Sequence, residues 1–104
     1  MEIRIYKDQK GNLPLVAWLG KLRDKRAREK IHTRIDRLKL GNKGDSKSLG
    51  NGLFEMRIHY GPGYRVYFGH SGENLILLLC GGNKDSQQQD VSLARKYWLD
   101  YRRP

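Results

Sequence analysis

Two short segments near the middle of the chain, residues 53–59 and 64–69, carry charged side chains at a spacing that could bind a phosphate. Apolar and polar residues alternate in both segments, which predicts two adjoining β-strands. The antiparallel register that keeps the apolar positions on one face places Arg57 directly opposite Arg65 on the other face. Two arginines in this position repel each other, at a cost of about 0.2–1 kcal/mol, but they suit bidentate binding of a phosphate. The pattern indicates an anion site, or else a merely solvated face on which Arg57 pairs with Glu55 or another carboxylate.

The same register places Glu55 opposite Tyr67 and leaves His59 at the end of the first of these strands. Tyr67, among the arginines, is therefore a candidate to stack on a nucleic-acid base. His59 fits either this charged face or an ordinary surface position at a strand end. Trp18 and Trp98, in contrast, occur at helical spacing beside aliphatic residues, which favours a place in the core.

A second basic group lies in residues 25–39, which contain seven basic and two acidic side chains. Arg28, Arg34 and Arg37 belong to this group. A solvated helix face and nonspecific contact with an RNA backbone both account for such a composition.

Other motifs with chemical meaning are weak or absent. Residues 41–48 superficially resemble a phosphate-binding loop, but Ser46 stands where the second glycine is required, and a helix precedes them instead of a strand. The three histidines and Cys80 have no spacing that suits a zinc site. Cys80 lies in an apolar run and pairs with no histidine motif, which predicts a buried thiol. We therefore expect neither a metal nor another cofactor.

These residues must be positioned by elements that periodicity, capping residues and turn residues predict. We expect a strand at about residues 2–7, a helix at 14–22 with Pro14 in its first turn, and a helix at 25–39 capped by Asp24. A glycine-rich loop at 41–52 should follow, then three strands at 53–59, 64–69 and 75–80, and a final helix at 86–101. The run 75–80 is apolar on both faces, as in a central strand that is covered on each side. The predicted fold is an α+β domain of order β-α-α-β-β-β-α, with helices against an antiparallel sheet.

Length and charge limit the classes of protein that remain. A chain of 104 residues has room for one core, so we expect a single domain over residues 1–104. Its 21 basic and 11 acidic residues leave a net charge of +10, which suits a polyanionic partner, most often nucleic acid. The longest apolar run is too short to span a membrane, and the first residues do not form a signal peptide. With its single cysteine, the chain is predicted to be cytoplasmic.

Three segments carry recognisable motifs: Leu53-Phe54-Glu55-Met56-Arg57-Ile58, Gly61-Pro62-Gly63-Tyr64-Arg65-Val66-Tyr67-Phe68 and Gly81-Gly82-Asn83-Lys84-Asp85-Ser86-Gln87. In this order and at these spacings they resemble the RelE/ParE toxin superfamily. Within it, the similarity is greatest to the HigB-like addiction module killer proteins. The resemblance extends over nearly the whole chain, and it includes Trp18-Leu19, Asp24 and the residues at 27–31, 41–42, 44–47 and 90–94.

The resemblance implies the same strand, helix and sheet order and the toxin of a type II toxin–antitoxin pair. Most RelE-like members enter the ribosomal A site and cleave mRNA there without a metal. The RNA 2′-OH attacks the adjacent phosphate, which leaves a cyclic phosphate and a 5′-OH. This reaction needs a base for the hydroxyl, cations for the phosphorane charge and an acid for the leaving oxygen.

Residue by residue, the resemblance implies that Arg65 matches the sheet arginine that family members use on the scissile phosphate. Glu55 and Arg57 match charged positions on the preceding strand, and Lys84 matches the basic residue after the last strand. We therefore expect Arg65 and Arg57 to bind the phosphate, with Lys84 as a third cation or proton donor. Glu55 is the expected general base and His59 the second candidate. RNA contacts are expected from Lys47, Tyr67, Arg28, Arg34 and Arg37.

The chain also departs from the best-known RelE pattern. Glutamines and Val91 stand where those relatives have a tyrosine early in the last helix, and Glu55 stands where they keep a lysine. The general base and RNA cleavage itself therefore stay open, and a non-catalytic ParE-like poison of DNA gyrase is the alternative. A purely structural RNA-binding domain is a third. Either toxin implies a helix-turn-helix antitoxin encoded beside it; the nuclease also implies mRNA and the ribosome as partners, and no membrane.

Overall fold

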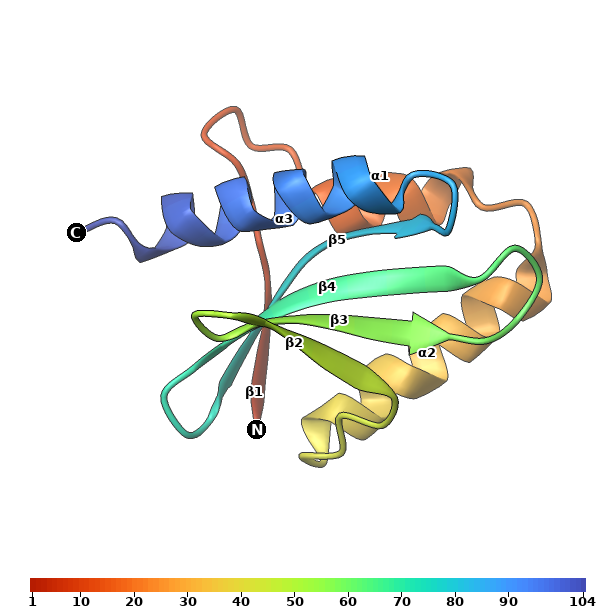
Figure 1. The fold of residues 1–104 in the computed structure, drawn as a ribbon, viewed down its shortest axis with the longest axis horizontal. Helices are drawn as coiled ribbons and strands as arrows, with labels where there is room; N and C mark the ends of the chain where they lie inside the picture. Colours follow the sequence, from red (N-terminus) through yellow and green to blue (C-terminus); the bar gives the residue numbers. More distant parts are fainter.

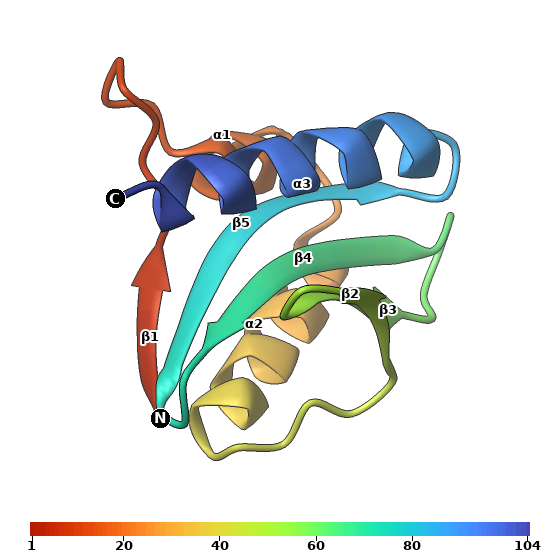
Figure 2. The same ribbon diagram turned by 60° about the vertical axis from the view of Figure 1, so that its left-hand side comes forward.

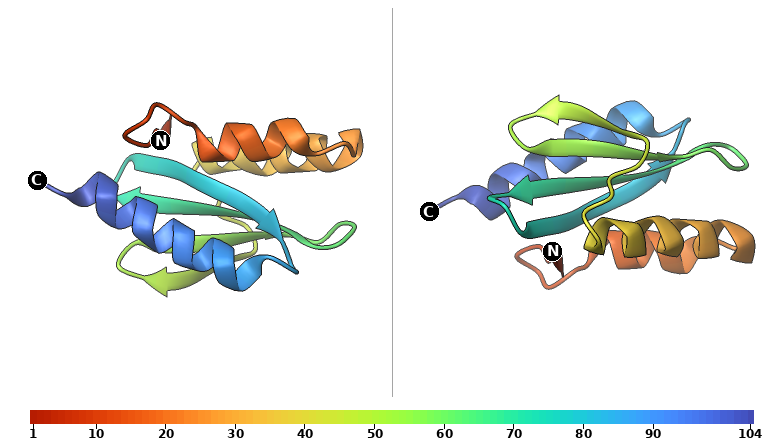
Figure 3. Two further views of the ribbon diagram at one scale, coloured as in Figure 1. Left: turned by 90° about the horizontal axis from the view of Figure 1, so that it is seen from above. Right: turned by 90° about the horizontal axis from the view of Figure 1, so that it is seen from below.

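Figure 1 shows the computed structural model of the protein, which describes residues 1–104. Along the chain follow β1 (Glu2–Ile5), α1 (Pro14–Lys21), α2 (Lys25–Lys39), β2 (Ser46–Gly50), β3 (Leu53–Ile58), β4 (Tyr64–Ser71), β5 (Leu75–Asn83) and α3 (Gln87–Arg102). The strands form one sheet in the order β1-β5-β4-β3-β2, with β1 parallel to β5 and the other neighbours antiparallel. The helices α1 and α2 cover one face of this sheet and α3 crosses the other (Figures 2 and 3).

The α+β class and the three helices agree with the prediction from sequence. Pro14 occupies the start of α1, where its fixed φ angle suits the first turn. The Asp24 carboxylate caps α2 by accepting a hydrogen bond from the Ala27 amide at 3.2 Å. One stripe of α2 is buried against the sheet and consists of Ala27, Ile31, Ile35 and Leu38. None of the helices has the length and apolar content that crossing a membrane requires.

The predicted order of strands was incomplete, because β2 lies within residues 41–52, which we expected to form a loop. Its sequence, Ser-Lys-Ser-Leu-Gly, has no apolar alternation, and it pairs with β3 alone at the edge of the sheet. The strand therefore depends on hydrogen bonds to β3 rather than on its own residues. The sheet is also mixed rather than antiparallel, because β1 runs parallel to β5.

Strand β5 extends through Gly81 and Gly82 to Asn83, beyond the predicted end at Cys80. These glycines leave room for side chains from the two helical layers. A Cβ atom on Gly81 would lie 2.3 Å from the Trp18 ring, and one on Gly82 would lie 1.7 Å from a carboxylate oxygen of Asp90. The glycines thus permit close approach of α1 and α3 and do not break the strand.

The sheet separates two hydrophobic cores. On the side of α1 and α2 the core includes Met56, Val66 and Phe68, and on the side of α3 it includes Tyr67 and Trp98. The predicted apolar run 75–80 contributes to both cores, so β5 is a central strand covered on each face, as expected. The fold leaves one end of the α3 face, beside the β3–β4 hairpin, for polar side chains.

Candidate functional site

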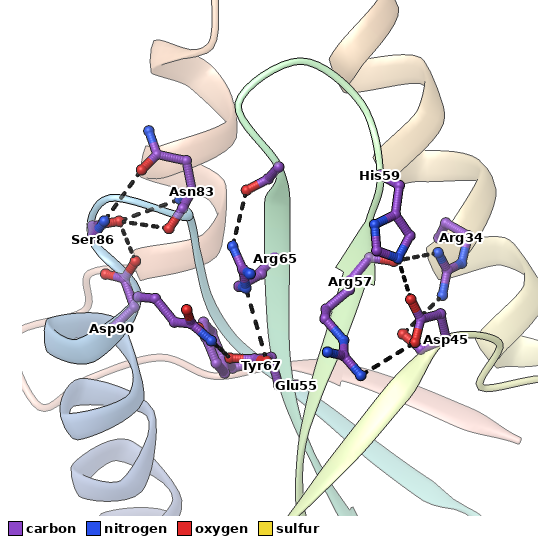
Figure 4. Close-up of polar contacts among 12 residues, drawn as sticks. Arg34, Asp45, Glu55, Arg57, His59, Arg65, Tyr67, Asn83, Ser86 and Asp90 are labelled. Atoms are coloured by element: carbon purple, nitrogen blue, oxygen red, sulfur yellow. Dashed lines mark hydrogen bonds and ion pairs between the residues drawn. The ribbon is translucent and has the colours of Figure 1, made fainter.

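Arg57 and Arg65 are directly paired across β3 and β4, as the sequence predicted. The next pair along the same face is Glu55 and Tyr67, which also agrees with the predicted register. Both pairs lie on the face that α3 crosses, near the N-terminal end of that helix (Figure 4). The alternation of the two strands therefore places two guanidinium groups at the same end of one sheet face.

Arg65 is the more enclosed of the two arginines, with a side chain that is 13% exposed. Its Nε lies 3.8 Å from Oε1 of Glu55, and its Nη1 donates a 3.2 Å hydrogen bond to the carbonyl of Gly63. The Nε atom itself is buried and makes no hydrogen bond. The guanidinium is therefore held in one place while part of its donor capacity is unused.

Glu55 lies beneath Arg65 and has a side chain that is only 2% exposed. Its Oε2 accepts a 3.0 Å hydrogen bond from the Tyr67 hydroxyl (Figure 4). It also accepts one from the Gln87 side-chain amide, at 3.0 Å. Both carboxylate oxygens thus face protein groups. The expectation that Glu55 meets a substrate hydroxyl as general base is not supported by this position, because the side chain does not reach the surface.

Tyr67 is fully buried between the sheet and α3, so the prediction that its ring stacks on a base is wrong. The pattern of alternation placed it on the correct face, but it could not show that α3 covers this part of the face. Burial and the bond to Glu55 raise the pKa of the Tyr67 hydroxyl, which keeps it protonated as a donor.

Arg57 lies nearer the edge of the sheet and reaches away from Arg65 toward Asp45 (Figure 4). Its Nη2 is 3.4 Å from Oδ1 of Asp45, and both side chains are roughly two-fifths exposed. Oδ2 of the same carboxylate is hydrogen bonded to Nε2 of His59, whose side chain is 75% exposed. The hydrogen bond from His59, with the charge of Arg57 as a further cause, lowers the pKa of Asp45.

The base of the Lys84 side chain lies near the Arg65 guanidinium, because both border Gly63 at the hairpin. A Cβ atom on Gly63 would lie 3.8 Å from Arg65 Nη1 and 3.9 Å from Lys84 Cβ. The turn that carries Lys84 is held by Asn83, whose side-chain oxygen accepts hydrogen bonds from the amides of Asp85 and Ser86 at 2.9 and 3.2 Å. Lys84 is exposed and forms no ion pair.

The residues predicted to contact RNA are spread over three places. Lys47 is exposed on β2, opposite Glu55, at the edge of the same sheet face. Arg28 donates to the carbonyl of Leu22 and lies beside the apolar groove between α1 and α2. Arg34 and Arg37 lie on a different side of α2 and line a cleft at the end of β3.

Comparison with known proteins identifies relatives of this chain. Residues 17–97 match the family described as phage-derived Gp49-like protein (DUF891). The chain belongs to the Gp49-like family. A protein of Haemophilus influenzae, described as uncharacterised, is 48% identical over 86 residues, which cover 83% of this chain and 87% of that protein. The part of the Gp49-like protein that matches the family contains Arg57, Arg65 and Lys84.

Two polar residues of the site were missed by the interpretation of the sequence. Asp45 directly precedes β2, a strand that the sequence does not predict, so the alternation of β3 and β4 alone does not place this carboxylate beside Arg57. Gln87 is one of three consecutive glutamines, and only its position at the start of α3 brings it to Glu55. Recognition of β2 as a partner of β3 would have revealed Asp45; no local signal distinguishes Gln87.

The site of this Gp49-like protein is suited to anions. Three cations, Arg57, Arg65 and Lys84, lie around one end of the sheet, and His59 lies beside Arg57 on the shared carboxylate of Asp45. No three side chains among His, Cys, Asp and Glu lie close enough together to hold a metal ion. Guanidinium groups bind phosphate through paired hydrogen bonds, and an imidazole can move a proton.

Proposed function

We propose that this Gp49-like protein is the toxin of a type II toxin–antitoxin pair and cleaves mRNA on the ribosome. Gp49-like proteins are associated with the toxins of such pairs, which supports the first part of the proposal. The basic composition and the anion site support the second part, because both suit a nucleic-acid backbone.

The observation that carries the proposal is the direct pairing of Arg57 with Arg65 at the hairpin end of the sheet, with Lys84 nearby. Each arginine already has one carboxylate partner, Asp45 for Arg57 and Glu55 for Arg65, so the argument for a ligand rests on how readily these partners give way. Arg57 is compensated only by the half-exposed carboxylate of Asp45, which an incoming phosphate can replace as its partner. Arg65 keeps buried Glu55 below it, so its guanidinium stays in position when a phosphate binds.

In the proposed reaction the 2′-oxygen of a nucleotide attacks the adjacent phosphorus, and the bond from phosphorus to the 5′-oxygen breaks. Arg57 and Arg65 stabilise the negative charge that develops on the phosphorane oxygens. The products are a 2′,3′-cyclic phosphate and a 5′-OH. Lys84 supplies a third positive charge and a proton for the leaving 5′-oxygen.

His59 is the residue we propose to take the proton from the 2′-OH. Nε2 is the donor to the Asp45 carboxylate, and in the neutral form of the ring Nδ1 therefore has the lone pair that can accept this proton. Glu55, which was the first candidate from sequence, has another role in this proposal. Its buried carboxylate, bonded to Tyr67 and Gln87, holds Arg65 in position.

The proposed partners are the ribosome with its mRNA and a helix-turn-helix antitoxin encoded next to this chain. Lys47, at the edge of the same face, is a further proposed contact to RNA. An acidic antitoxin segment would complement the net charge of +10 and could cover the site. Both partners are consistent with action in the cytoplasm.

Mapping of transcript ends after induction in a bacterial host tests the proposed activity. We expect cuts in phase with codons, and loss of those cuts in the Arg65→Ala variant. A DNA-damage response with intact transcripts would instead indicate a gyrase poison. Harmless overproduction, together with the absence of a neighbouring antitoxin gene, would contradict the toxin proposal as a whole.

A further inference from the structure

A basic cleft lies between α2 and the end of β3, outside the group of Arg57, Arg65 and Lys84. Its volume is about 510 Å³, and it is lined by Arg26, Glu29, Lys30, Thr33, Arg34, Arg37, Ile58 and His59. Five of these eight residues are basic or histidine and one is acidic. Apart from His59, these basic side chains have no part in the proposed reaction.

The charges of the cleft are not balanced within the protein. Arg26, Lys30 and Arg37 form no ion pair with a carboxylate. They recur along one side of α2 over about 16 Å of helix, and Arg26 and Lys30, four residues apart, repel each other. Glu29 is the one carboxylate in the lining, so the cleft keeps an excess of positive charge that an anion can neutralise.

Arg34 forms the fixed part of this cleft. Its Nη1 donates a 2.6 Å hydrogen bond to the carbonyl of Arg57, and its Nη2 lies 3.4 Å from the carbonyl of Lys43. The arginine thereby attaches α2 to the strand that carries the proposed phosphate-binding residue (Figure 4). It forms no ion pair, so its positive charge also remains available.

The cleft is continuous with the proposed active site through His59. This residue lines the cleft and also shares the Asp45 carboxylate with Arg57. A strand of nucleic acid whose scissile phosphate lies at Arg57 and Arg65 can therefore pass His59 and continue along α2. The order of the basic groups is Arg57, His59, and then the stripe of α2.

We propose that this cleft binds the phosphodiester backbone of single-stranded RNA on one side of the cleavage point, an inference that rests on the proposed function. An acidic protein segment is less suited to it, because Ile58 is the one hydrophobic residue of the lining. Protein interfaces are anchored by buried apolar or aromatic side chains, which the cleft does not offer. A phosphate backbone needs cations and no apolar anchor.

The experiment measures binding of fluorescein-labelled single-stranded RNA of about 6 and about 18 nucleotides as a function of salt. The test variant combines Arg26→Gln, Lys30→Gln and Arg37→Gln in the full chain. The matched control combines Lys7→Gln, Lys10→Gln and Lys96→Gln, which removes the same charge from exposed positions elsewhere. Arg34 is left unchanged because its hydrogen bonds hold α2 to the sheet.

We expect the test variant to bind the longer RNA at least about 10-fold more weakly than the control. In a plot of the logarithm of the binding constant against the logarithm of the salt concentration, its slope should be smaller in magnitude by about 2. Binding of the shorter RNA changes equally in both variants. Equal loss of long-RNA affinity in test and control would overturn the proposal. If the triple variant does not fold, each single substitution should lower the slope by about 0.7.

Cleavage on programmed ribosomes is measured in parallel and separates this inference from the proposed function. If the wild type never cleaves but the test variant loses affinity for the longer RNA, the cleft proposal stands and the nuclease proposal is refuted. If the test variant binds and cleaves RNA like the control, the cleft proposal is refuted and the nuclease proposal stands. If the test variant binds RNA normally but no longer forms a complex with the helix-turn-helix protein encoded next to it, the cleft binds a protein partner and the proposal is wrong.

Discussion

Arg57 and Arg65 lie directly opposite each other on neighbouring strands, but their side chains reach different carboxylates. Arg65 lies above buried Glu55, whereas Arg57 extends to exposed Asp45. Arg65 is thus preorganised, whereas the ion pair between Arg57 and Asp45 is weakened by its exposure to solvent. A phosphate that binds between them needs to displace only the Asp45 contact.

Arg65→Ala is expected to slow single-turnover mRNA cleavage on programmed ribosomes by at least about 100-fold, because a fixed donor to the developing charge is lost. Arg65→Lys should recover little of this, since an ammonium does not reproduce the planar fork of a guanidinium. Lys96→Ala, at an exposed position, is the control and should cleave like the wild type. Cleavage by Arg65→Ala at the wild-type rate would show that the assignment is wrong.

Tyr67→Phe is expected to lower the free energy of unfolding by about 1–3 kcal/mol, because buried Glu55 loses one of its two hydrogen-bond donors. Urea unfolding of the variant measures this change. Tyr60→Phe is a matched control: its hydroxyl makes only a 3.5 Å contact to Asp24 at the surface, so we expect a change of less than about 0.5 kcal/mol. Equal effects of the two substitutions would contradict the buried network.

Asp45→Asn tests the carboxylate shared by Arg57 and His59. The pKa of Asp45 is lower in the folded protein than its ordinary value of 3.8, so its contacts stabilise the fold above that value and are lost as the pH falls through the folded pKa. The wild type should therefore have the higher melting temperature at neutral pH, and the difference should vanish in acid. A difference that persists at pH values where Asp45 is fully protonated would rule out this origin.

Cys80 is expected to resist thiol reagents in the native protein. It is 5% exposed, and burial raises its pKa to about 12, so almost no thiolate exists at pH 8. Labelling with a chromogenic disulfide reagent should be slow in buffer and complete in urea. Rapid native labelling would mean that the α3 side of the sheet opens readily.

Gly69→Ala is expected to destabilise the fold by about 1–3 kcal/mol through overpacking. A Cβ atom at this position would lie 2.2 Å from the Trp98 ring, which is held by a 2.8 Å hydrogen bond from its Nε1 to the carbonyl of Asn51. Gly20→Ala in α1 is the control, with no atom within 4 Å of the added carbon. It should stabilise the helix by about 0.5–1 kcal/mol, and thermal unfolding of both variants measures the contrast.

The residues that were predicted correctly are those whose neighbours in the sequence determine their position. Alternation along β3 and β4 was sufficient to pair Arg57 with Arg65, because only one register buries every apolar side chain. Asp24 was recognisable as a helix cap because a cap bonds an amide three residues away. The Gly-rich segment before β3 gave no such signal for β2, since that strand is stabilised by its partner.

The sequence by itself determined the α+β class, the sheet register around the two arginines and the excess of positive charge, because periodicity and charge are local properties of the chain. Only the tertiary structure decided that Glu55 is buried, that Tyr67 is covered by α3, and that Asp45 reaches Arg57. The burial of a polar side chain depends on groups distant in sequence, such as Gln87, which lies 32 residues from the carboxylate that it binds. Alternation assigns a residue to a face of the sheet, whereas packing decides whether that face is open to a ligand.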